Sequence, residues 1–194
     1  EILTLKNNQV SLYKPEEGLP KVSITAIYQD AKKRIWFATA GEGIYCKDGT
    51  HFYNINSNDG LSDDNINCLY SPDGKQVIAG TDRGLSFITF ESGKKNISFF
   101  SSKNGLPDNI VCCVIASQQK DKVWVGMQSK GFLLFNIVEK KITDSVNKSK
   151  WQYGQINKMT DLKDELFIAT EQNGVIGYNK IFFIIFSFQN IFKL

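Results

Sequence analysis

The chain has 194 residues, of which 42% are hydrophobic and 22% are charged, a composition typical of a globular protein with a core of its own. The formal net charge of +3 is small and does not favour nucleic-acid binding, which relies on a basic patch or stripe. The densest basic runs, at 32–34, 94–95 and 140–141, fall where hairpin turns are expected, so we predict solvated turns there.

The thiols and the single imidazole form no pattern that is typical of a metal site or a disulfide framework. Cys46, Cys68, Cys112 and Cys113 include no CxxC pair, and His51 is not near them in sequence. A chain of this size also has little need of disulfide bonds. We therefore expect small buried thiols, a surface histidine, no metal and no cofactor.

The first segment, residues 1–15, reads as β-strand from its start, and no signal-peptide pattern opens it. Residues 2–14 look like the outer strands of a repeat unit whose inner strands are missing. We therefore expect the sequence to begin inside a domain, with residues 1–15 belonging to a preceding unit.

A short phrase then occurs three times, as EEGLPK from Glu16, NDGLSDD from Asn58 and KNGLPDN from Lys103, with its glycines 42 and 45 residues apart. Branched apolar residues stand six and nine positions after each glycine. A small residue stands eight positions after it, and Cys68 and Cys113 share that position. Glycine permits the backbone angles of a tight corner, and we expect the leucine to pack between neighbouring units. The repeated pairs are Gly18 and Leu19, Gly60 and Leu61, and Gly105 and Leu106.

Each phrase is followed by the pattern of a four-stranded unit. A polar turn leads to a β-rich run, at 35–39, 77–81 and 123–127, and a degenerate fourth copy occupies 156–179. Alternating hydrophobicity, β-branched and aromatic residues, and Gly, Pro and Asp between the runs favour strands over helices. A second glycine with an apolar partner follows each run, at Gly43, Gly84, Gly131 and Gly174.

Close to its C-terminal end the sequence has the apolar run IFFIIFSF, which covers only the eight residues 181–188. A membrane-spanning helix needs about 20 apolar residues, so we predict a buried strand here. A truncated or non-native tail is the alternative.

A four-stranded unit repeated every 40 to 50 residues or so is typical of a β-propeller, since one blade cannot cover both of its own faces. We predict an all-β fold of about four blades, as a partial propeller or a small ring. The boundaries are 16–57, 58–102, 103–147 and, with the degenerate motif and apolar tail, 148–194, all in one propeller domain. A β-sandwich of similar strand count is the alternative.

Large side chains share one position in the β-rich runs. Trp36, Trp124 and Phe167 occupy it in three units, and Ile78 fills it in the second. We expect these side chains to wedge between adjacent blades.

The three full copies resemble the two-component regulator propeller repeat. That pattern runs approximately Asp-Gly-Leu-Ser-Asp-Asn, then Val-x-x-Ile-x-x-Asp, a polar turn, Leu-Trp-Ile-Gly-Thr and Gly-Leu. The second unit reads DGLSDDNINCLYSPDGKQVIAGTDRGLSFI at 59–88, and the first and third match at 17–45 and 104–136. The resemblance covers residues 16–179 and is loose in the fourth copy.

The resemblance implies a non-catalytic, extracytoplasmic ligand-sensing segment of a two-component, histidine-kinase-type phosphorelay protein. It implies a periplasmic location, a carbohydrate-derived ligand such as an oligosaccharide, and no membrane contact in this segment. A homodimer formed through the parent sensor is left open. Members of the family typically have paired seven-bladed propellers followed by a sandwich, a membrane helix and a kinase. This sequence has four units and none of the last three motifs, so we expect a fragment of a longer sensor. A closed four-blade ring completed by residues 2–14 is the alternative.

Propeller geometry predicts that the corners at the repeated phrase and the turns after the β-rich runs share one face near the central channel. Polar side chains there could hydrogen-bond a sugar; the alternative is that Asp and Asn only support the turns. The candidate ligand-binding residues are Glu42, Asp63, Asp64, Asp82, Arg83, Asp108, Asn109, Gln128, Lys130 and Glu171.

Two other functions remain open at this point. A propeller-fold polysaccharide lyase or glycosidase would place carboxylates around the channel, and a protein-interaction scaffold would need neither ligand nor catalysis. No catalytic residues are assigned, because no nucleophile, base and acid arrangement can be assembled from the sequence.

Overall fold

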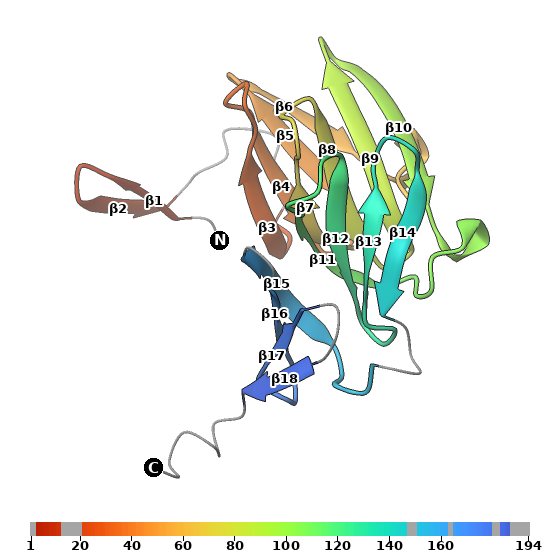
Figure 1. The fold of residues 1–194 in the computed structure, drawn as a ribbon. Helices are drawn as coiled ribbons and strands as arrows, with labels where there is room; N and C mark the ends of the chain where they lie inside the picture. The colour runs from red at the N-terminus through yellow and green to blue at the C-terminus, as the bar shows by residue number, and fades with distance from the viewer. Residues whose placement is uncertain (1–2, 13–20, 147–150, 163–164, 180–182, 187–194) are drawn as a thin grey trace.

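The computed structural model describes residues 3–12, 21–146, 151–162, 165–179 and 183–186, which form antiparallel β-sheets (Figure 1). Sheet 1 contains β3 (Ile24–Gln29), β4 (Ile35–Thr39), β5 (Ile44–Asp48) and β6 (His51–Ile55). Sheet 2 contains β7 (Ile66–Tyr70), β8 (Gln76–Thr81), β9 (Gly84–Glu91) and β10 (Lys94–Phe100). Sheet 3 contains β11 (Val111–Ala116), β12 (Lys122–Met127), β13 (Phe132–Asn136) and β14 (Lys141–Val146). Sheet 4 contains β15 (Ile156–Leu162), β16 (Glu165–Thr170), β17 (Val175–Tyr178) and β18 (Phe183–Phe186).

The four sheets stand side by side in chain order (Figure 1). Within each sheet, strands that follow one another in sequence are hydrogen-bonded neighbours. Contacts between sheets run from β3 to β7, from β7 to β11 and from β11 to β15, so the first strand of each sheet is the inner one. This arrangement confirms the predicted all-β propeller of four small sheets, and the β-sandwich alternative is wrong.

The core lies between the sheets rather than within any one of them. Trp36 of sheet 1 packs with Val77 and Phe90 of sheet 2, and its ring meets the Phe90 ring edge-on at 6.1 Å. Ile78 of sheet 2 packs with Val125 of sheet 3. The large side chains of the β-rich runs therefore sit between successive sheets. In the third interface, Trp124 packs with Leu166 and Ile168 of sheet 4.

Phe167 does not share these surroundings. It pairs with Gly177 in β17 and occupies the same strand position as Trp36, but it is only half-buried and belongs to none of the core clusters of the described residues. The expected wedge at Phe167 is absent from the described part of the chain, because sheet 4 is the last sheet of the row and no further sheet lies against that face.

The repeated phrase forms a corner between one sheet and the next. A short 3-10 turn, Ser57–Asp59, precedes Gly60, and a second, Ser102–Asn104, precedes Gly105; these glycines have φ values of 109° and 102°. Such angles are costly for residues with a Cβ. Leu61 and Leu106 follow them and are buried in the interfaces between sheets 1 and 2 and between sheets 2 and 3. Gly18 and Leu19 lie outside the described residues.

The second glycines allow the turn after each β-rich run to approach the outer part of the same sheet. A Cβ on Gly43 would lie 2.3 Å from the carbonyl oxygen of Ile55, and one on Gly84 would lie 2.3 Å from that of Phe100. Both glycines have positive φ values, so the turn requires glycine for space and for backbone angle. Gly131 and Gly174 also have positive φ values, of 76° and 69°.

The described strands nearest the two ends of the chain do not join into one sheet. The strands β1 (Leu3–Lys6) and β2 (Gln9–Leu12) pair only with each other, and the outer position of sheet 4 is occupied by β18. Residues 3–12 therefore do not complete the fourth sheet, and the closed ring of that form is wrong. The predicted terminal strand exists as β18, but it is an edge strand in which Ile184 is 39% exposed.

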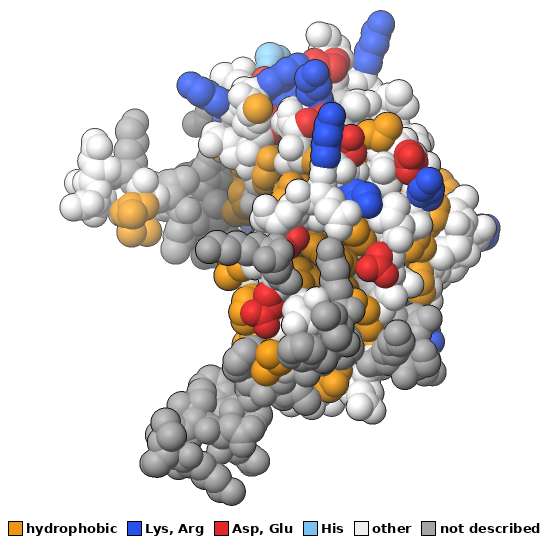
Figure 2. Space-filling view, viewed as in Figure 1, with side chains coloured by type: hydrophobic (Ala, Val, Ile, Leu, Met, Phe, Trp, Pro, Cys, Tyr) orange, Lys and Arg blue, Asp and Glu red, His pale blue; other side chains and the backbone are white. Residues whose placement is uncertain are grey.

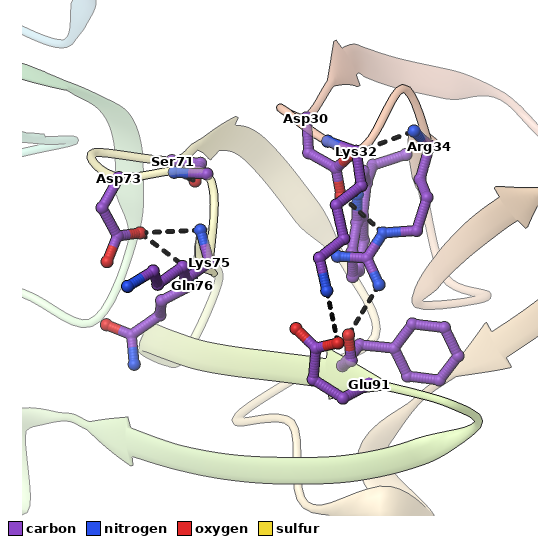
Figure 3. A network of polar contacts seen from close by, with 11 residues as sticks. Asp30, Lys32, Arg34, Ser71, Asp73, Lys75, Gln76 and Glu91 are labelled. Carbon is purple, nitrogen blue, oxygen red and sulfur yellow. Dashed lines mark hydrogen bonds and ion pairs between the residues drawn. The ribbon is translucent and has the colours of Figure 1, made fainter.

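The basic run at 32–34 is not simply a solvated turn, because Arg34 is buried (Figure 3). Its Nε donates to Asp30 Oδ2 at 2.6 Å and its Nη1 donates to the Phe90 carbonyl of sheet 2 at 2.6 Å. Trp36 Nε1 donates to the same Asp30 oxygen at 2.9 Å. Nearby, Lys32 pairs with Glu91. The run therefore fastens the β3–β4 turn of sheet 1 to the β9–β10 hairpin of sheet 2.

Candidate functional site

A pocket of about 380 Å³ opens where the four inner strands begin. Its lining comes from all four sheets, so the pocket exists only because the sheets stand side by side. The lining residues are Thr25, Asn67, Asp82, Ile110, Cys112, Gln128, Gln155, Ile156 and Asn157.

A β-bulge at the same place in each inner strand supplies one lining residue per sheet. The strand register shifts between Ile24 and Ala26, between Ile66 and Cys68, and at the equivalent places in β11 and β15. The residue skipped by each shift is unpaired in the ladder, and a bulge re-aims such a side chain. The four skipped residues all line the pocket: Thr25, Asn67, Cys112 and Asn157.

Two of these side chains also connect neighbouring sheets. The Thr25 hydroxyl donates to the carbonyl oxygen of Ile66 in sheet 2. Asn67 Nδ2 donates to the carbonyl oxygen of Val111 in sheet 3 at 3.2 Å. Ile66 and Val111 are equivalent residues, so the same bond is made at two successive interfaces. The pocket wall is thus part of the connection between sheets.

Of the predicted ligand-binding residues, the structure brings two into the pocket wall. Asp82 follows the last residue of β8, and its Oδ1 accepts a hydrogen bond from Asn67 Nδ2 at 2.9 Å. Gln128 follows β12, and its Nε2 donates to Gln155 Oε1 at 3.3 Å across the boundary between sheets 3 and 4. These contacts place one carboxylate and three side-chain amides around the same opening.

The four predicted residues at the corners bond chiefly to neighbouring backbone. Asp64 accepts hydrogen bonds from the backbone and hydroxyl of Ser57, both at 2.7 Å, and Asn109 accepts one from the Ser102 backbone at 3.1 Å. Asp63 accepts from the Asn65 backbone at 2.8 Å. Such bonds are those that Asp and Asn make to support turns. Asp108 likewise accepts hydrogen bonds from Ile110 and Ser129.

The remaining predicted residues do not line the pocket. Arg83 pairs with Asp63 at 3.0 Å, and its side chain is 76% exposed. Glu42 and Glu171 are exposed, and Lys130 is half-buried. The predicted set therefore spans one face of the molecule but only partly coincides with the pocket.

Sequence reasoning missed the bulge residues and Gln155, although a signal for the bulges existed. The seventh residue after each repeated glycine is polar in Thr25 and Asn67, while the sixth, eighth and ninth positions are apolar. A polar residue between apolar ones, in an inner strand whose two faces are both covered, indicates a side chain that does not point into either apolar interface. Gln155 precedes β15, where the repeated phrase is lost, and carries no such signal.

The expectation of buried thiols is confirmed for three of the four cysteines and is wrong for Cys112, which is half-buried because the bulge in β11 turns its side chain into the pocket wall. All four cysteines are free, and Cys46, Cys68 and Cys113 are buried in the interfaces between sheets. Burial raises the pKa of the Cys46 and Cys112 thiols to about 12 and that of Cys68 to about 11, and it also raises the pKa of Cys113. These thiols are protonated at neutral pH, so the Cys112 side chain in the pocket wall is a weakly polar surface and not a nucleophile.

Charge on the face shown in Figure 2 is mixed, with Lys and Arg side chains interspersed among Asp and Glu. Within the described residues no group of three or more His, Cys, Asp or Glu side chains is placed to hold a metal ion. That same part of the chain contains no helix with the length and apolarity required to cross a bilayer.

The sequence matches one family model, described as the two component regulator propeller, over residues 18–41. This segment leads into sheet 1 and contains β3 and β4, and the match confirms the resemblance to that repeat. The search of curated proteins found no match to the chain.

Solved structures of similar fold include two extracellular domains from B. thetaiotaomicron. One is assigned to the hybrid two component system BT3049, with a TM-score of 0.77 and 23% identity over 92% of this chain and 26% of that one. The other is assigned to the one component system BT4673, with a TM-score of 0.71 and 18% identity over 94% of this chain and 27% of that one. The chain thus spans about a quarter of the length of these domains. At these identities the similarity shows the fold.

A computationally designed protein, Ika4, is also similar, with a TM-score of 0.61 and 13% identity. The match covers 82% of this chain and 92% of the designed one. The sheet arrangement is therefore reached by a sequence with little in common with this one.

Proposed function

We propose that this chain is part of an extracytoplasmic, ligand-sensing propeller of a two-component signalling protein, and that its ligand is derived from carbohydrate. The pocket formed jointly by the four sheets is the observation on which the proposal rests. The repeat match at 18–41 and the similarity to extracellular domains of signalling systems support the same assignment. In this reading the segment lies on the periplasmic side, and any kinase belongs to another part of the protein.

The chemistry of the pocket wall suits a saccharide. Amide, carboxylate and hydroxyl groups from different sheets converge there, together with the apolar side chains of Ile110 and Ile156. Convergent polar groups on a partly apolar wall are typical of small-molecule sites. Sugar hydroxyls both donate and accept hydrogen bonds, and carboxamides offer both partners.

Sensing without catalysis fits this wall better than glycoside hydrolysis. Glycosidases usually position a pair of carboxyl groups on either side of the scissile bond. Among the described residues that line the pocket, Asp82 alone carries a carboxylate. The proposal is therefore that the segment binds its ligand and releases it unchanged.

Calorimetric titration of the chain with a panel of oligosaccharides tests the proposal, together with an assay for new reducing ends or unsaturated products. We expect saturable binding without turnover. Asn157→Trp fills the pocket from an exposed position and is expected to weaken binding at least tenfold, or about 1.4 kcal/mol. The matched control is Lys120→Trp, in the turn at the opposite end of β11 and β12.

Two results would contradict the proposal. Turnover of a bound oligosaccharide would assign an enzyme instead of a sensor. If Lys120→Trp weakened binding and Asn157→Trp did not, the binding site would lie at the opposite end of the sheets from the pocket.

A further inference from the structure

The pocket wall offers both donors and acceptors that the described residues do not already use. Asp82 Oδ1 and both N–H groups of Asn67 are engaged, since Asn67 Nδ2 bonds to Asp82 and to the Val111 carbonyl. Within the described parts of the chain, the second carboxylate oxygen of Asp82 and the Asn67 carbonyl oxygen have no hydrogen-bond partner. The Asn157 carboxamide, on an exposed residue of the pocket wall, likewise makes no hydrogen bond within the described residues, and it offers one donor group and one acceptor. Hydroxyl groups can satisfy all three.

Asp82 is the one formally charged side chain among the described lining residues. Its position is fixed by the 2.9 Å bond from Asn67, so the carboxylate cannot turn away from the pocket without losing that contact. A carboxylate accepts hydrogen bonds and repels other anions, most strongly where water is partly excluded. A ligand carboxylate or sulfate placed beside Asp82 would lose a hydrogen bond and meet a like charge.

Two cationic side chains stand beside lining residues and must be considered. Arg83 follows Asp82, but its guanidinium is paired with Asp63 at 3.0 Å. Lys158 follows Asn157 in β15 and is exposed, and its charge acts on the Cys68 and Cys113 thiols, where it opposes the rise in pKa that burial causes. Neither forms an ion pair with Asp82 in the described structure, and the carboxylate retains its charge toward the pocket.

We propose that the pocket selects hydroxyl-rich ligands that carry no negative charge, and that Asp82, held by Asn67, is the residue that excludes acidic ones. The inference rests on the proposed function and narrows its ligand class to neutral saccharides. Asp82 acts on specificity through direct contact, whereas Asn67 positions it.

The test compares each neutral oligosaccharide of the panel with its C6-oxidised, uronic acid counterpart of the same linkage and length. Calorimetry on the full 194-residue chain gives the ratio of the two affinities. We expect the chain to prefer the neutral form, and Asp82→Asn, which keeps the Asn67 bond, to reduce that preference by about tenfold. Asp73→Asn removes an equal charge in the β7–β8 turn, at the opposite end of these strands from the pocket, and is expected to leave the ratio unchanged. Thermal denaturation confirms that each variant is folded.

The outcomes separate this inference from the function on which it rests. If the acidic form binds as tightly as the neutral one, and Lys158→Gln changes the ratio while Asp82→Asn does not, the specificity assignment is overturned and saccharide sensing stands. If neither form of any oligosaccharide binds the chain, the proposed function and the specificity assignment are both overturned.

Discussion

Asp30 shows how a single buried carboxylate can hold two sheets together. Burial alone would raise its pKa, but hydrogen bonds from Trp36 and Arg34 and the Arg34 charge outweigh that effect and lower the pKa below its ordinary value of 3.8. The ionised form is therefore stabilised by folding. Arg34 carries the link to the Phe90 carbonyl in sheet 2, so the stability of the first interface depends on this charge.

The pH dependence of stability follows from the direction of that pKa shift. The contribution of Asp30 is fully present above pH 3.8 and is lost as the pH falls through the lowered pKa of the folded state. Asp30→Asn breaks a buried ion pair and is expected to destabilise the protein by about 3 kcal/mol at neutral pH. The free energy of unfolding of the variant should also decrease less between neutral and acidic pH than that of the wild type. Urea denaturation at neutral and acidic pH measures both effects.

The control for this prediction is Asp73→Asn in the equivalent turn of sheet 2. Asp73 accepts only backbone hydrogen bonds from Lys75 and Gln76, which asparagine can also accept. Equal effects of the two substitutions would show that the Asp30 pair has no special role.

Lys140 is a buried cation whose removal should stabilise the protein. Its amine has no hydrogen-bond partner among the described residues and lies 3.1 Å from the centroid of the Phe87 ring. Burial lowers its pKa to about 8. The contact with the ring face offsets part of the cost of burying the charge. The basic run at 140–141 is thus not wholly solvated, contrary to expectation.

Lys140→Met is expected to raise stability by about 1 kcal/mol at pH 7, after allowance for solvent screening and the lost ring contact. Because the folded pKa lies below the ordinary value of 10.5, the folded protein binds fewer protons between pH 8 and 10.5, and wild-type stability rises across that window. The advantage of the variant should therefore shrink by pH 10. Urea denaturation at pH 7 and pH 10 measures the effect, with the neighbouring Lys141→Met as the control. The prediction is refuted if Lys140→Met is less stable than the wild type at both pH values.

At the scale of the element, glycines in the second strands set how closely successive sheets approach. A Cβ on Gly126 would lie 2.6 Å from Cys113 Sγ and 2.9 Å from Ile156 Cγ2 of sheet 4. We expect Gly126→Ala to cost about 1–3 kcal/mol through overpacking. Its thermal midpoint should fall together with that of Gly80→Ala, where a Cβ would lie 2.5 Å from Cys68 Sγ. If the thermal midpoints of both variants equalled that of the wild type, the sheets would be able to move apart without loss of stability, and these glycines would not set their spacing.

Large side chains at the equivalent strand position should contribute more to the free energy of unfolding where a neighbouring sheet covers them. Trp124→Ala is expected to cost about 3–5 kcal/mol, because it opens a cavity against sheet 4. Phe167→Ala, at the half-buried position on the last sheet, should cost about 1–2 kcal/mol. Chemical denaturation of the two variants measures the difference, and equal losses would contradict the packing described here.

The parts of the fold that repeat were predictable, and the parts that depend on position in the row were not. Alternating apolar residues and glycines at a fixed period predicted the strands, the corners and the wedge residues. Nothing in that period shows that Phe167 lies on the last sheet or that Arg34 bonds to Phe90 of another sheet. Of the residues that line the pocket, only Asp82 and Gln128 were predicted from the sequence. The bulge residues were missed because a bulge changes the direction of a side chain without changing the residue pattern around it.

At the scale of the whole molecule, the row of sheets ends in two faces that differ from those inside it. Ile27 of sheet 1 is 57% exposed, whereas Leu69, its equivalent in sheet 2, packs into the first interface. Val175 of sheet 4 is 38% exposed, whereas Ile44, its equivalent in sheet 1, is buried. The interior interfaces therefore carry the stability, and the pocket depends on all of them.

The central claim is that one ligand site is built from the bulges of four different sheets. The most direct measurement is the affinity of one neutral oligosaccharide for Thr25→Leu, Asn67→Leu, Cys112→Leu and Asn157→Leu, each corrected for its folded fraction. We predict that all four substitutions weaken binding by about fivefold or more, because each alters the same wall. Retention of wild-type affinity in the variants of three sheets, with loss in one alone, would contradict a shared site.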